Sequence, residues 1–271
     1  LPEWIETESN SRPATAEAVT LPVTLNGQIY GEQDADYFRF ALKKDQVLVC
    51  DVLAGRIGSQ LDPIIQVLDA RGRPLDCQQV RVGTDPLLAL QVPHDGDYLL
   101  RVANITYHGN AACVYRITLT TSPQAVYSVP AGGRGGTKAA VEVFTMTGGR
   151  SLAVRKQAFA LPESKGPFRP PGLSAPQLVV DDRDNRLESE PNDTHKQAQA
   201  VDLPATLHGR LASATDKDTF RFTARKDQRY TFRCQVVPAG LPTLPVLTLS
   251  DHSGKQLAEA QAVKDPDREA R

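Results

Sequence analysis

The chain contains its N-terminal segment twice. Residues 6–10, Glu-Thr-Glu-Ser-Asn, return at 188–192 as Glu-Ser-Glu-Pro-Asn, and residues 34–40 return at 216–222. The register holds without a gap as far as the Lys-Asp-Gln of 44–46, which returns at 226–228. A match of this length in constant register indicates a duplicated structural module. A repeated, acid-rich module is typical of an appendage that binds or spaces, because a catalytic centre is usually present once.

Composition restricts the class of protein. The 271 residues are enough for two or three domains. Because the formal net charge is -1 and the basic residues are dispersed, the chain lacks the basic stripe of a nucleic-acid-binding surface. No apolar run approaches the ~20 residues of a membrane span. The chain opens with Leu-Pro-Glu and shows no signal peptide, so we expect a mature form or a piece of a longer polypeptide.

Short apolar runs separated by Gly, Asp and Pro predict an all-β fold. In residues 36–42, Phe38 and Phe40 fall on one face and Arg39 on the other, which is the period of a half-buried strand. No segment has the periodicity of an amphipathic helix. The pattern predicts an antiparallel β-sandwich or jelly roll over residues 1–122. Further strands are expected at 25–29, 46–53, 64–68, 87–92, 98–102 and 114–120.

The duplicated modules flank a different segment, residues 123–185. A glycine-rich stretch at 129–136 is followed there by alternating and then proline-rich runs. We expect a small immunoglobulin-like β domain, with a flexible spacer as the alternative. The second module, 186–271, has no counterparts of the last three strands of the first. A sandwich without those strands would expose core and strand edges, so we expect a truncated module; the alternative is a partner strand that covers the gap.

The cysteines leave two interpretations open. Cys50, Cys77 and Cys113 lie in the first module and Cys234 in the second, and none forms a CxxC pair. A zinc ribbon or a thioredoxin-type site is therefore not expected. Cys50 and Cys113 are a candidate disulfide pair in an oxidising compartment. The alternative is that all four are small buried hydrophobic residues.

The repeated acidic segments predict a calcium site. In an extended segment, Glu188, Glu190 and Asn192 point to one face. If the two acidic segments meet, their carboxylates crowd together unless a cation neutralises them, and calcium accepts six to eight such oxygens. The alternative is a solvated linker and a turn. The predicted ligands of the second module are Glu188, Glu190, Asn192, Asp193, Asp216 and Asp218.

The first module keeps most of these residues. Ser11 stands in place of Asp193, which removes one carboxylate, so weaker binding is expected there. Its predicted ligands are Glu6, Glu8, Asn10, Asp34 and Asp36.

No catalytic motif stands out. The histidines form neither an HExxH motif nor a close pair, and no GxSxG elbow is present. The glycine run at 132–136 lacks the Gly-Lys-Ser/Thr ending of a phosphate-binding loop and fits a flexible hairpin or linker better. We therefore expect a protein that is not an enzyme.

The order of motifs resembles the bacterial pre-peptidase C-terminal domain. The motifs are Glu-x-Glu-Pro-Asn-Asp at 188–193, Asp-x-Asp-x-Phe-x-Phe at 216–222, Leu-Asp-Pro at 61–63 and Asp-Gly-x-Tyr-x-Leu-x-Val at 95–102. The resemblance implies a jelly-roll sandwich appended to secreted proteases and other large extracellular proteins. The modules are also similar to the collagen-binding modules of bacterial collagenases, in which calcium ties the N-terminal linker to the sandwich. The middle segment resembles the immunoglobulin-like inserts that separate such modules.

These observations lead to one set of expectations. We expect two jelly-roll modules around an immunoglobulin-like spacer, forming a non-catalytic binding or spacing region of a larger secreted or surface protein. Calcium is the expected cofactor, and the expected partner is an extracellular protein or polysaccharide. The expected location is extracellular, cell-surface or periplasmic. The alternatives are a substrate-targeting appendage of a secreted protease or glycosidase and a carbohydrate-binding module.

Overall fold

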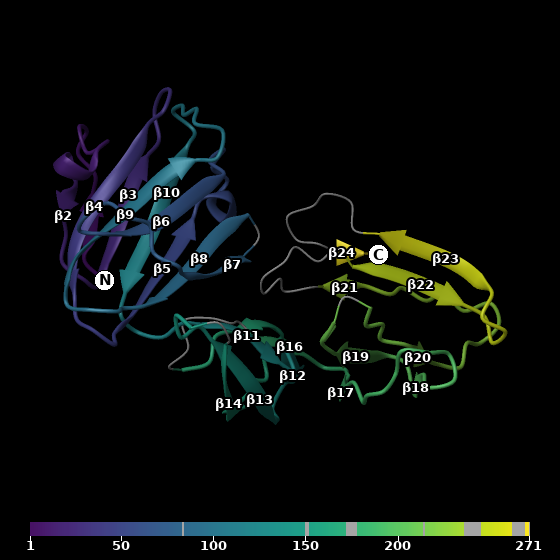
Figure 1. Cartoon of the computed structure of the whole chain (residues 1–271). Coiled ribbons are helices and arrows are strands. Elements are labelled where there is room, and N and C mark those ends of the chain that lie inside the picture. The colour runs from purple at the N-terminus through teal and green to yellow at the C-terminus, as the bar shows by residue number, and fades with distance from the viewer. Residues whose placement is uncertain are drawn as a thin grey trace. The chain divides into compact units, whose positions relative to one another are not determined.

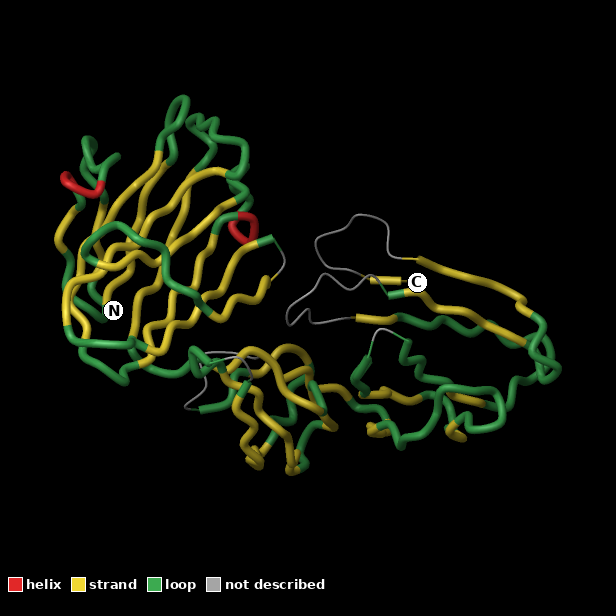
Figure 2. Tube along the Cα trace, in the orientation of Figure 1, coloured by secondary structure: helices red, strands yellow, loops and turns green. Residues whose placement is uncertain are grey.

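The fold consists almost wholly of strands. The computed structural model describes residues 1–82, 84–149, 152–171, 178–213, 215–235, 245–261 and 269–270. In this part of the chain the helical elements are two 3₁₀ turns, η1 (Pro13–Thr15) and η2 (Gly55–Ile57), and every other element is a strand (Figures 1 and 2). The prediction of an all-β protein is confirmed. Within the described residues, no helix is long and apolar enough for a membrane span.

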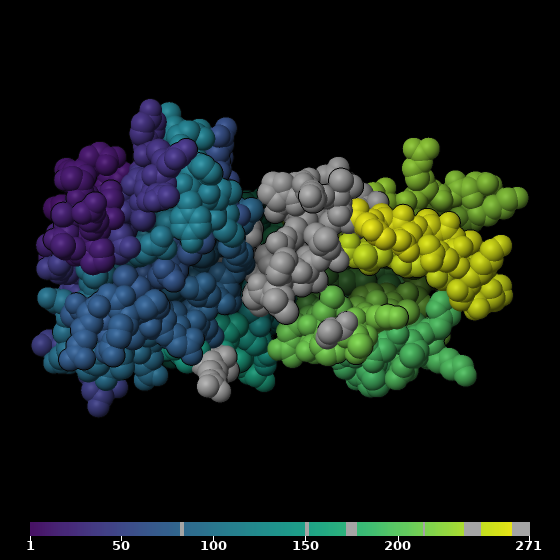
Figure 3. All heavy atoms as spheres, turned by 45° about the horizontal axis from the view of Figure 1, so that its top comes forward, coloured from purple at the N-terminus to yellow at the C-terminus, as the bar shows by residue number. Residues whose placement is uncertain are grey.

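The chain divides into two compact units, and each is described by itself. The first contains Leu1–Gln124 and Met146–Ala153, and the second contains Ala125–Thr145 and the described residues from Val154 onward. Atoms of residues 1–124, coloured from purple to teal, form one continuous body on the face shown in Figure 3.

The first module is a sandwich of two sheets. One sheet has the order β1 (Glu3–Ile5), β3 (Val23–Gln28), β10 (Val114–Thr120), β5 (Val47–Leu53), β8 (Asp85–Gln91) and β7 (Gln78–Val82). The other has the order β2 (Glu17–Ala18), β4 (Ala35–Leu42), β9 (Gly96–Asn104) and β6 (Pro63–Asp69). Successive strands from β3 to β6 alternate between the sheets, and β9 and β10 insert between earlier strands. This is the predicted jelly-roll arrangement.

The core lies between the inner faces of these sheets. On β4, Phe38 and Phe40 are buried while Arg39 is exposed, as the period-two pattern predicts. Opposite them, β10 contributes Ile117 and β3 contributes Leu25, both fully buried. The expected strands are all present; the short strands β1 and β2 and the edge strand β7 were not predicted.

The segment between the two modules contains two three-stranded sheets. One consists of β11 (Ala125–Val129), β13 (Lys138–Thr145) and β14 (Ala153–Ala160), and the other of β12 (Gly132–Arg134), β16 (Leu178–Asp181) and β15 (Gly166–Phe168). Val141, Val143, Leu178 and Val180 are buried in its core. The glycine run is not a flexible linker, because Gly132 pairs with Val179 in the ladder of β12 and β16.

The second module is made of two-stranded sheets. They pair β17 (Asp184–Leu187) with β19 (Ala205–His208), β18 (Gln199–Ala200) with β20 (Phe220–Arg221), β21 (Cys234–Gln235) with β24 (Glu269–Ala270), and β22 (Val246–Ser250) with β23 (Gln256–Gln261). The parallel pairs β17–β19 and β18–β20 reproduce β1–β3 and β2–β4 of the first module. The duplication seen in the sequence is therefore also a duplication of local structure.

All four cysteines are free. Cys50 on β5 lies opposite Leu119 on β10, whereas Cys113 precedes that strand. Six residues of extended chain span about 20 Å. The candidate pairing of Cys50 with Cys113 was therefore wrong, because the register of β5 and β10 keeps the two sulfurs far apart.

Candidate metal centre

Acidic side chains from two separate segments meet in the second module. Glu188 and Glu190 follow β17, Asp218 precedes β20, and one carboxylate oxygen of each lies within 4.8 Å of the others. Among the described residues, this is the one group of His, Cys, Asp or Glu side chains with the spacing of metal ligands. The segments are joined because Thr219 donates its backbone N–H to the carbonyl oxygen of Asn192 at 3.0 Å.

A glycine makes room for this triad of Glu188, Glu190 and Asp218. Gly209 directly follows β19, and a Cβ atom there would lie 2.9 Å from Asp218 Oδ2 and still closer to Glu188 Oε2. The neighbouring backbone N–H, on Arg210, donates to Glu188 Oε1 at 2.7 Å. The two residues after β19 thus have separate roles. Arg210 orients the Glu188 carboxylate, and Gly209 leaves the space that this carboxylate occupies.

Several buried polar atoms of the site have no hydrogen-bond partner. Asn192 is fully buried, yet neither its side-chain oxygen nor its side-chain nitrogen is bonded. Glu188 Oε2 and Asp218 Oδ1 are also buried without a partner. Buried polar groups are nearly always paired, because an unpaired one costs about 1–3 kcal/mol. The oxygen atoms of this site therefore lack partners within the protein, and they would be suitable ligands for a bound cation.

The electrostatics favour a cation as well. Burial, followed by the neighbouring Asp218 carboxylate, raises the pKa of Glu188 to about 7, although the Arg210 N–H opposes that rise. Burial is also the main cause that raises the pKa of Asp218; the neighbouring Glu188 carboxyl group opposes the rise, and Asp216 and Asp193 add to it. Negative charges crowded in a partly buried site would be relieved by a positive ion.

Two of the predicted ligands lie beside the triad. Asp193 accepts a hydrogen bond from the backbone N–H of Lys217 at 3.2 Å. Asp216 accepts one from the backbone N–H of Ala212 and so closes the turn before β20. The structure therefore brings Glu188, Glu190 and Asp218 together, with these two carboxylates nearby.

The first module repeats this arrangement of backbone and carboxylates, but a tyrosine side chain lies in its site. The backbone N–H of Gln28 donates to Glu6 Oε1 at 2.5 Å, as Arg210 does to Glu188. The Tyr115 hydroxyl lies 2.6 Å from Glu6 Oε2 and 2.6 Å from Asp36 Oδ2. Because a phenol carries one hydrogen, it donates to one carboxylate, and the other must bring a proton of its own. Burial, followed by Glu6, raises the pKa of Asp36 to about 9, so Asp36 is the group that holds this proton.

The remaining predicted ligands of the first module are dispersed. Asn10 is buried with both side-chain polar atoms unpartnered, like its counterpart Asn192. Glu8 is exposed. Asp34 accepts the backbone N–H of Tyr30 at 2.7 Å and the Ser11 hydroxyl at 3.4 Å.

Tyr115 was missed at the level of sequence. It comes from β10, at a separation of 109 residues from Glu6, and nothing local marks it. The strand glycine, Gly27, was visible in the repeat, but its steric role becomes clear only once Glu6 and Tyr115 are seen beside it.

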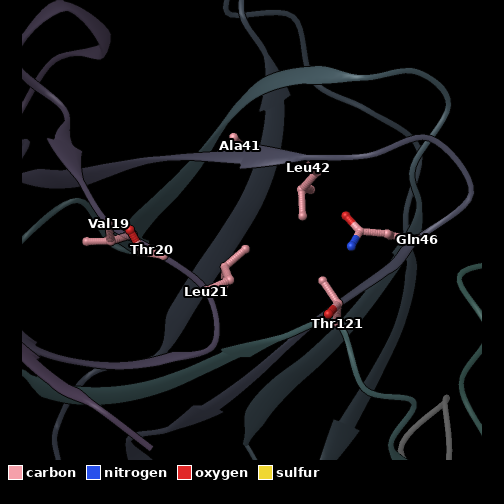
Figure 4. A pocket seen from close by; sticks show the side chains of 7 residues that line it. All are labelled: Val19, Thr20, Leu21, Ala41, Leu42, Gln46 and Thr121. Atoms are coloured by element: carbon pink, nitrogen blue, oxygen red, sulfur yellow. The ribbon is translucent and has the colours of Figure 1, made fainter.

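A hollow of about 200 Å³ lies elsewhere in the first module, near the end of β4 that is farther from Asp36 (Figure 4). Leu21 and Leu42 point into it between Gln46 and Thr121. Its lining has neither a charged group nor an aromatic ring, so we assign it no ligand. The full lining is Val19, Thr20, Leu21, Ala41, Leu42, Gln46 and Thr121.

The chain was compared with known proteins. No family model matches the sequence, and no curated protein matches it. Eight solved chains match its structure. One of them is the pre-peptidase C-terminal domain of collagenase from Bacillus anthracis, with a TM-score of 0.33 and 17% sequence identity; the match covers 41% of this chain and 100% of that chain.

Proposed function

We propose that this chain is a non-catalytic binding or spacing region of a larger secreted or surface protein, and that calcium stabilises its modules. The observation that carries the proposal is the incomplete donor set of the second module. Three carboxylates lie within 4.8 Å of one another, beside a fully buried asparagine whose amide is unpartnered. The resemblance of the motifs to pre-peptidase C-terminal domains supports a location outside the cytoplasm.

The donor chemistry favours calcium over softer metals. The available ligand atoms are carboxylate and amide oxygens, which hard cations prefer, and their number suits the flexible coordination of calcium. Neither histidine nor cysteine belongs to the triad. An ion held by Glu188, Glu190 and Asp218 would tie the segment that enters the module to the start of β20. Its role is therefore stabilisation of the module entrance.

The first module should bind calcium more weakly. The Tyr115 hydroxyl and a shared proton already satisfy much of the pair formed by Glu6 and Asp36. A cation would have to displace that proton, which costs affinity at low pH. We therefore expect two unequal sites.

A second candidate function is carbohydrate binding. Tyr30 and Tyr107 are 64% and 51% exposed. They lie on neighbouring loops, because Gln33 donates its backbone N–H to the carbonyl oxygen of Tyr107 at 2.8 Å. Exposed tyrosine rings can present an apolar face to a ligand while their hydroxyls bond to it. A glycan array with the wild type and with Tyr107→Ala would test this function; no binding to any glycan would refute it.

Calorimetric titration of calcium into chelator-stripped protein tests the leading proposal. We expect binding and a raised melting temperature, since a ligand that binds only the folded state stabilises it. Glu188→Gln and Asp218→Asn should remove the tighter site, while Glu259→Gln, which changes an exposed acid on β23, should bind like the wild type. The absence of both heat and stabilisation at millimolar calcium would refute the proposal.

A further inference from the structure

Alternate residues of one strand in the second module contact the sheets that precede it, within the second compact unit. Thr206 and His208 lie on β19, and Arg210 follows two residues later. In an extended segment, alternate side chains point to the same side. Gly209, between the last two, faces the Glu188 carboxylate, so these three side chains point away from the acidic site. We call them the outer face of β19.

The first contact of the outer face is a polar network around Asp181. This residue ends β16, and its side chain is 14% exposed. Asp181 accepts hydrogen bonds from the Thr206 hydroxyl and, at 2.8 Å, from the Asn185 amide. Because an amide oxygen can only accept, His208 donates from Nε2 to Asn185 Oδ1 at 2.7 Å. Burial acts to raise the pKa of Asp181, but the bonds from Thr206 and Asn185 outweigh it and lower that pKa below its usual value.

The second contact is aromatic. Tyr127 on β11 and Phe144 on β13 stack with ring centroids 4.3 Å apart, and the guanidinium carbon of Arg210 lies 5.7 Å from the Phe144 centroid. Val143 faces the core of these sheets, so the next residue, Phe144, lies on their outer side. It is nevertheless only 5% exposed. A cation within about 6 Å of a ring centroid is attracted by the π electrons of the ring.

The first module uses the same face differently. Its residues at the positions of the histidine and the arginine are Asn26 and Gln28. Asn26 donates to Glu3 Oε2 at 2.7 Å, and the Gln28 side chain donates to the carbonyl oxygen of Ala111 at 2.8 Å. Both partners belong to the first module. The two copies of the strand therefore differ in sequence where the second copy contacts the preceding sheets.

We propose that the outer face of β19 is a docking surface for the sheets formed by β11–β16, and that these sheets and the second module move as one rigid body. The chemistry of the two sides matches, since a carboxylate meets a hydroxyl group and an aromatic pair meets a guanidinium group. Arg210 also connects the docking surface to the acidic site, because its backbone N–H donates to Glu188 Oε1 at 2.7 Å. It is thus a positioning residue for Glu188. The proposal does not depend on calcium, so its tests are carried out in chelator.

Pulsed electron paramagnetic resonance between two spin labels tests whether the two parts move together. The labels replace Lys156 on β14 and Lys226 in the second module, both exposed, and are attached through non-natural amino acids because the native cysteines are free. We expect one narrow distance distribution for the wild type. The double variant Thr206→Val and Phe144→Leu loses the hydroxyl and the ring, and its distribution should be at least about twofold wider, because parts joined by a weak interface move independently.

Two variants are the matched controls. Thr24→Val changes the same position of the first module, and Phe159→Leu removes a ring that packs against the core of the sheets rather than against Arg210. Neither should widen the distribution. Arg210→Met changes an exposed side chain and should widen it, which keeps the test valid if the double variant does not fold.

Amide hydrogen exchange of the same proteins tests the link to the acidic site. The Arg210 amide should exchange about two- to fivefold faster in the double variant than in the wild type, and Phe159→Leu should leave its rate unchanged. A broad distribution in the wild type, or equal widths in the wild type and the double variant, would overturn the docking surface. A wider distribution with an unchanged rate at Arg210 would overturn its positioning role. Because both measurements are made without calcium, neither failure would be confused with failure of the metal centre.

Discussion

Gly209→Ala tests the proposed metal centre without removing any ligand. The added Cβ would lie 2.9 Å from Asp218 Oδ2 and closer to Glu188 Oε2, whereas an ordinary contact begins near 3.4 Å. The Asp218 oxygen must therefore move by about 0.5 Å, and the Glu188 carboxylate by more. Because Gly209 does not have a positive φ, the backbone itself accepts alanine.

The magnitude follows from what Glu188 loses. A carboxylate pushed from its position no longer reaches the ion, and an interaction with a charged group contributes about 1.5–3 kcal/mol. That range corresponds to a roughly 10- to 150-fold loss of calcium affinity. In the variant, the displaced Glu188 carboxylate also strains its hydrogen bond with the Arg210 N–H, and this strain lowers the stability of the calcium-free protein. The smaller conformational freedom of alanine in the unfolded chain offsets about 0.4–1 kcal/mol of that loss.

Calorimetric titration of the stripped variant, with a parallel melt in chelator, separates the two effects. We expect the tighter site to weaken while the melting temperature in chelator changes little. Gly149→Ala is the matched control, because its Cβ would come no closer than 3.6 Å to the Thr147 side chain. Gly27→Ala should affect the first module's site alone, since its Cβ would collide with Glu6 and Tyr115. Wild-type affinity and stoichiometry in Gly209→Ala would refute the steric reasoning.

Three further predictions concern stability. In chelator, the raised pKa values of Glu188 (to about 7) and Asp36 (to about 9) mean that the folded protein binds these protons more tightly than the unfolded chain. The stability that these two protons add to the folded state is complete below pH 3.8 and is lost as the pH rises through 7 and then 9. Thermal melts across this pH range should show a falling melting temperature, and saturating calcium should make the melting temperature less dependent on pH. Tyr115→Phe should destabilise the first module by about 1–3 kcal/mol in urea titrations, because it leaves buried carboxyl groups unpartnered; an unchanged midpoint would contradict this. Asp85→Ala should lower the free energy of unfolding by about 3–5 kcal/mol, since this fully buried carboxylate accepts hydrogen bonds from three backbone N–H groups and an arginine side chain. As a control, Asp95→Ala, at an exposed position, should lower it by less than about 1 kcal/mol.

Much of the fold could be predicted from sequence because the strands of the first module carry regular patterns. Phe38 and Phe40 alternate with Arg39, and burial follows that alternation. Strands β1 and β2 have three and two residues, too few to show a period. The disulfide pairing was wrong because register, which decides whether Cys50 meets Cys113, is a property of the whole sheet.

The site was predictable only in part for a related reason. The spacing of Glu188 and Glu190 placed them on one face, and the repeat pointed to Asp216 and Asp218 as their partners. The sequence could not distinguish Asp218 from Asp216, whose carboxylate is used by the backbone of its own turn. It could not reveal Tyr115 either, because that side chain arrives from the last strand of the module.

The parallel pairing of β1 with β3 has a mechanical consequence. Glu3 lies beside Thr24, and Leu119, near the end of β10, lies beside Val23, so the start of β1 and the end of β10 lie at the same end of the first module. A stretching force applied through them would peel β1 and β10 from β3 one hydrogen bond at a time, which requires less force than shearing them all at once. The module would therefore unfold at low force when it is stretched. An ion bound at Glu6 would hold the far end of β1 in place and raise the force needed to unfold the module.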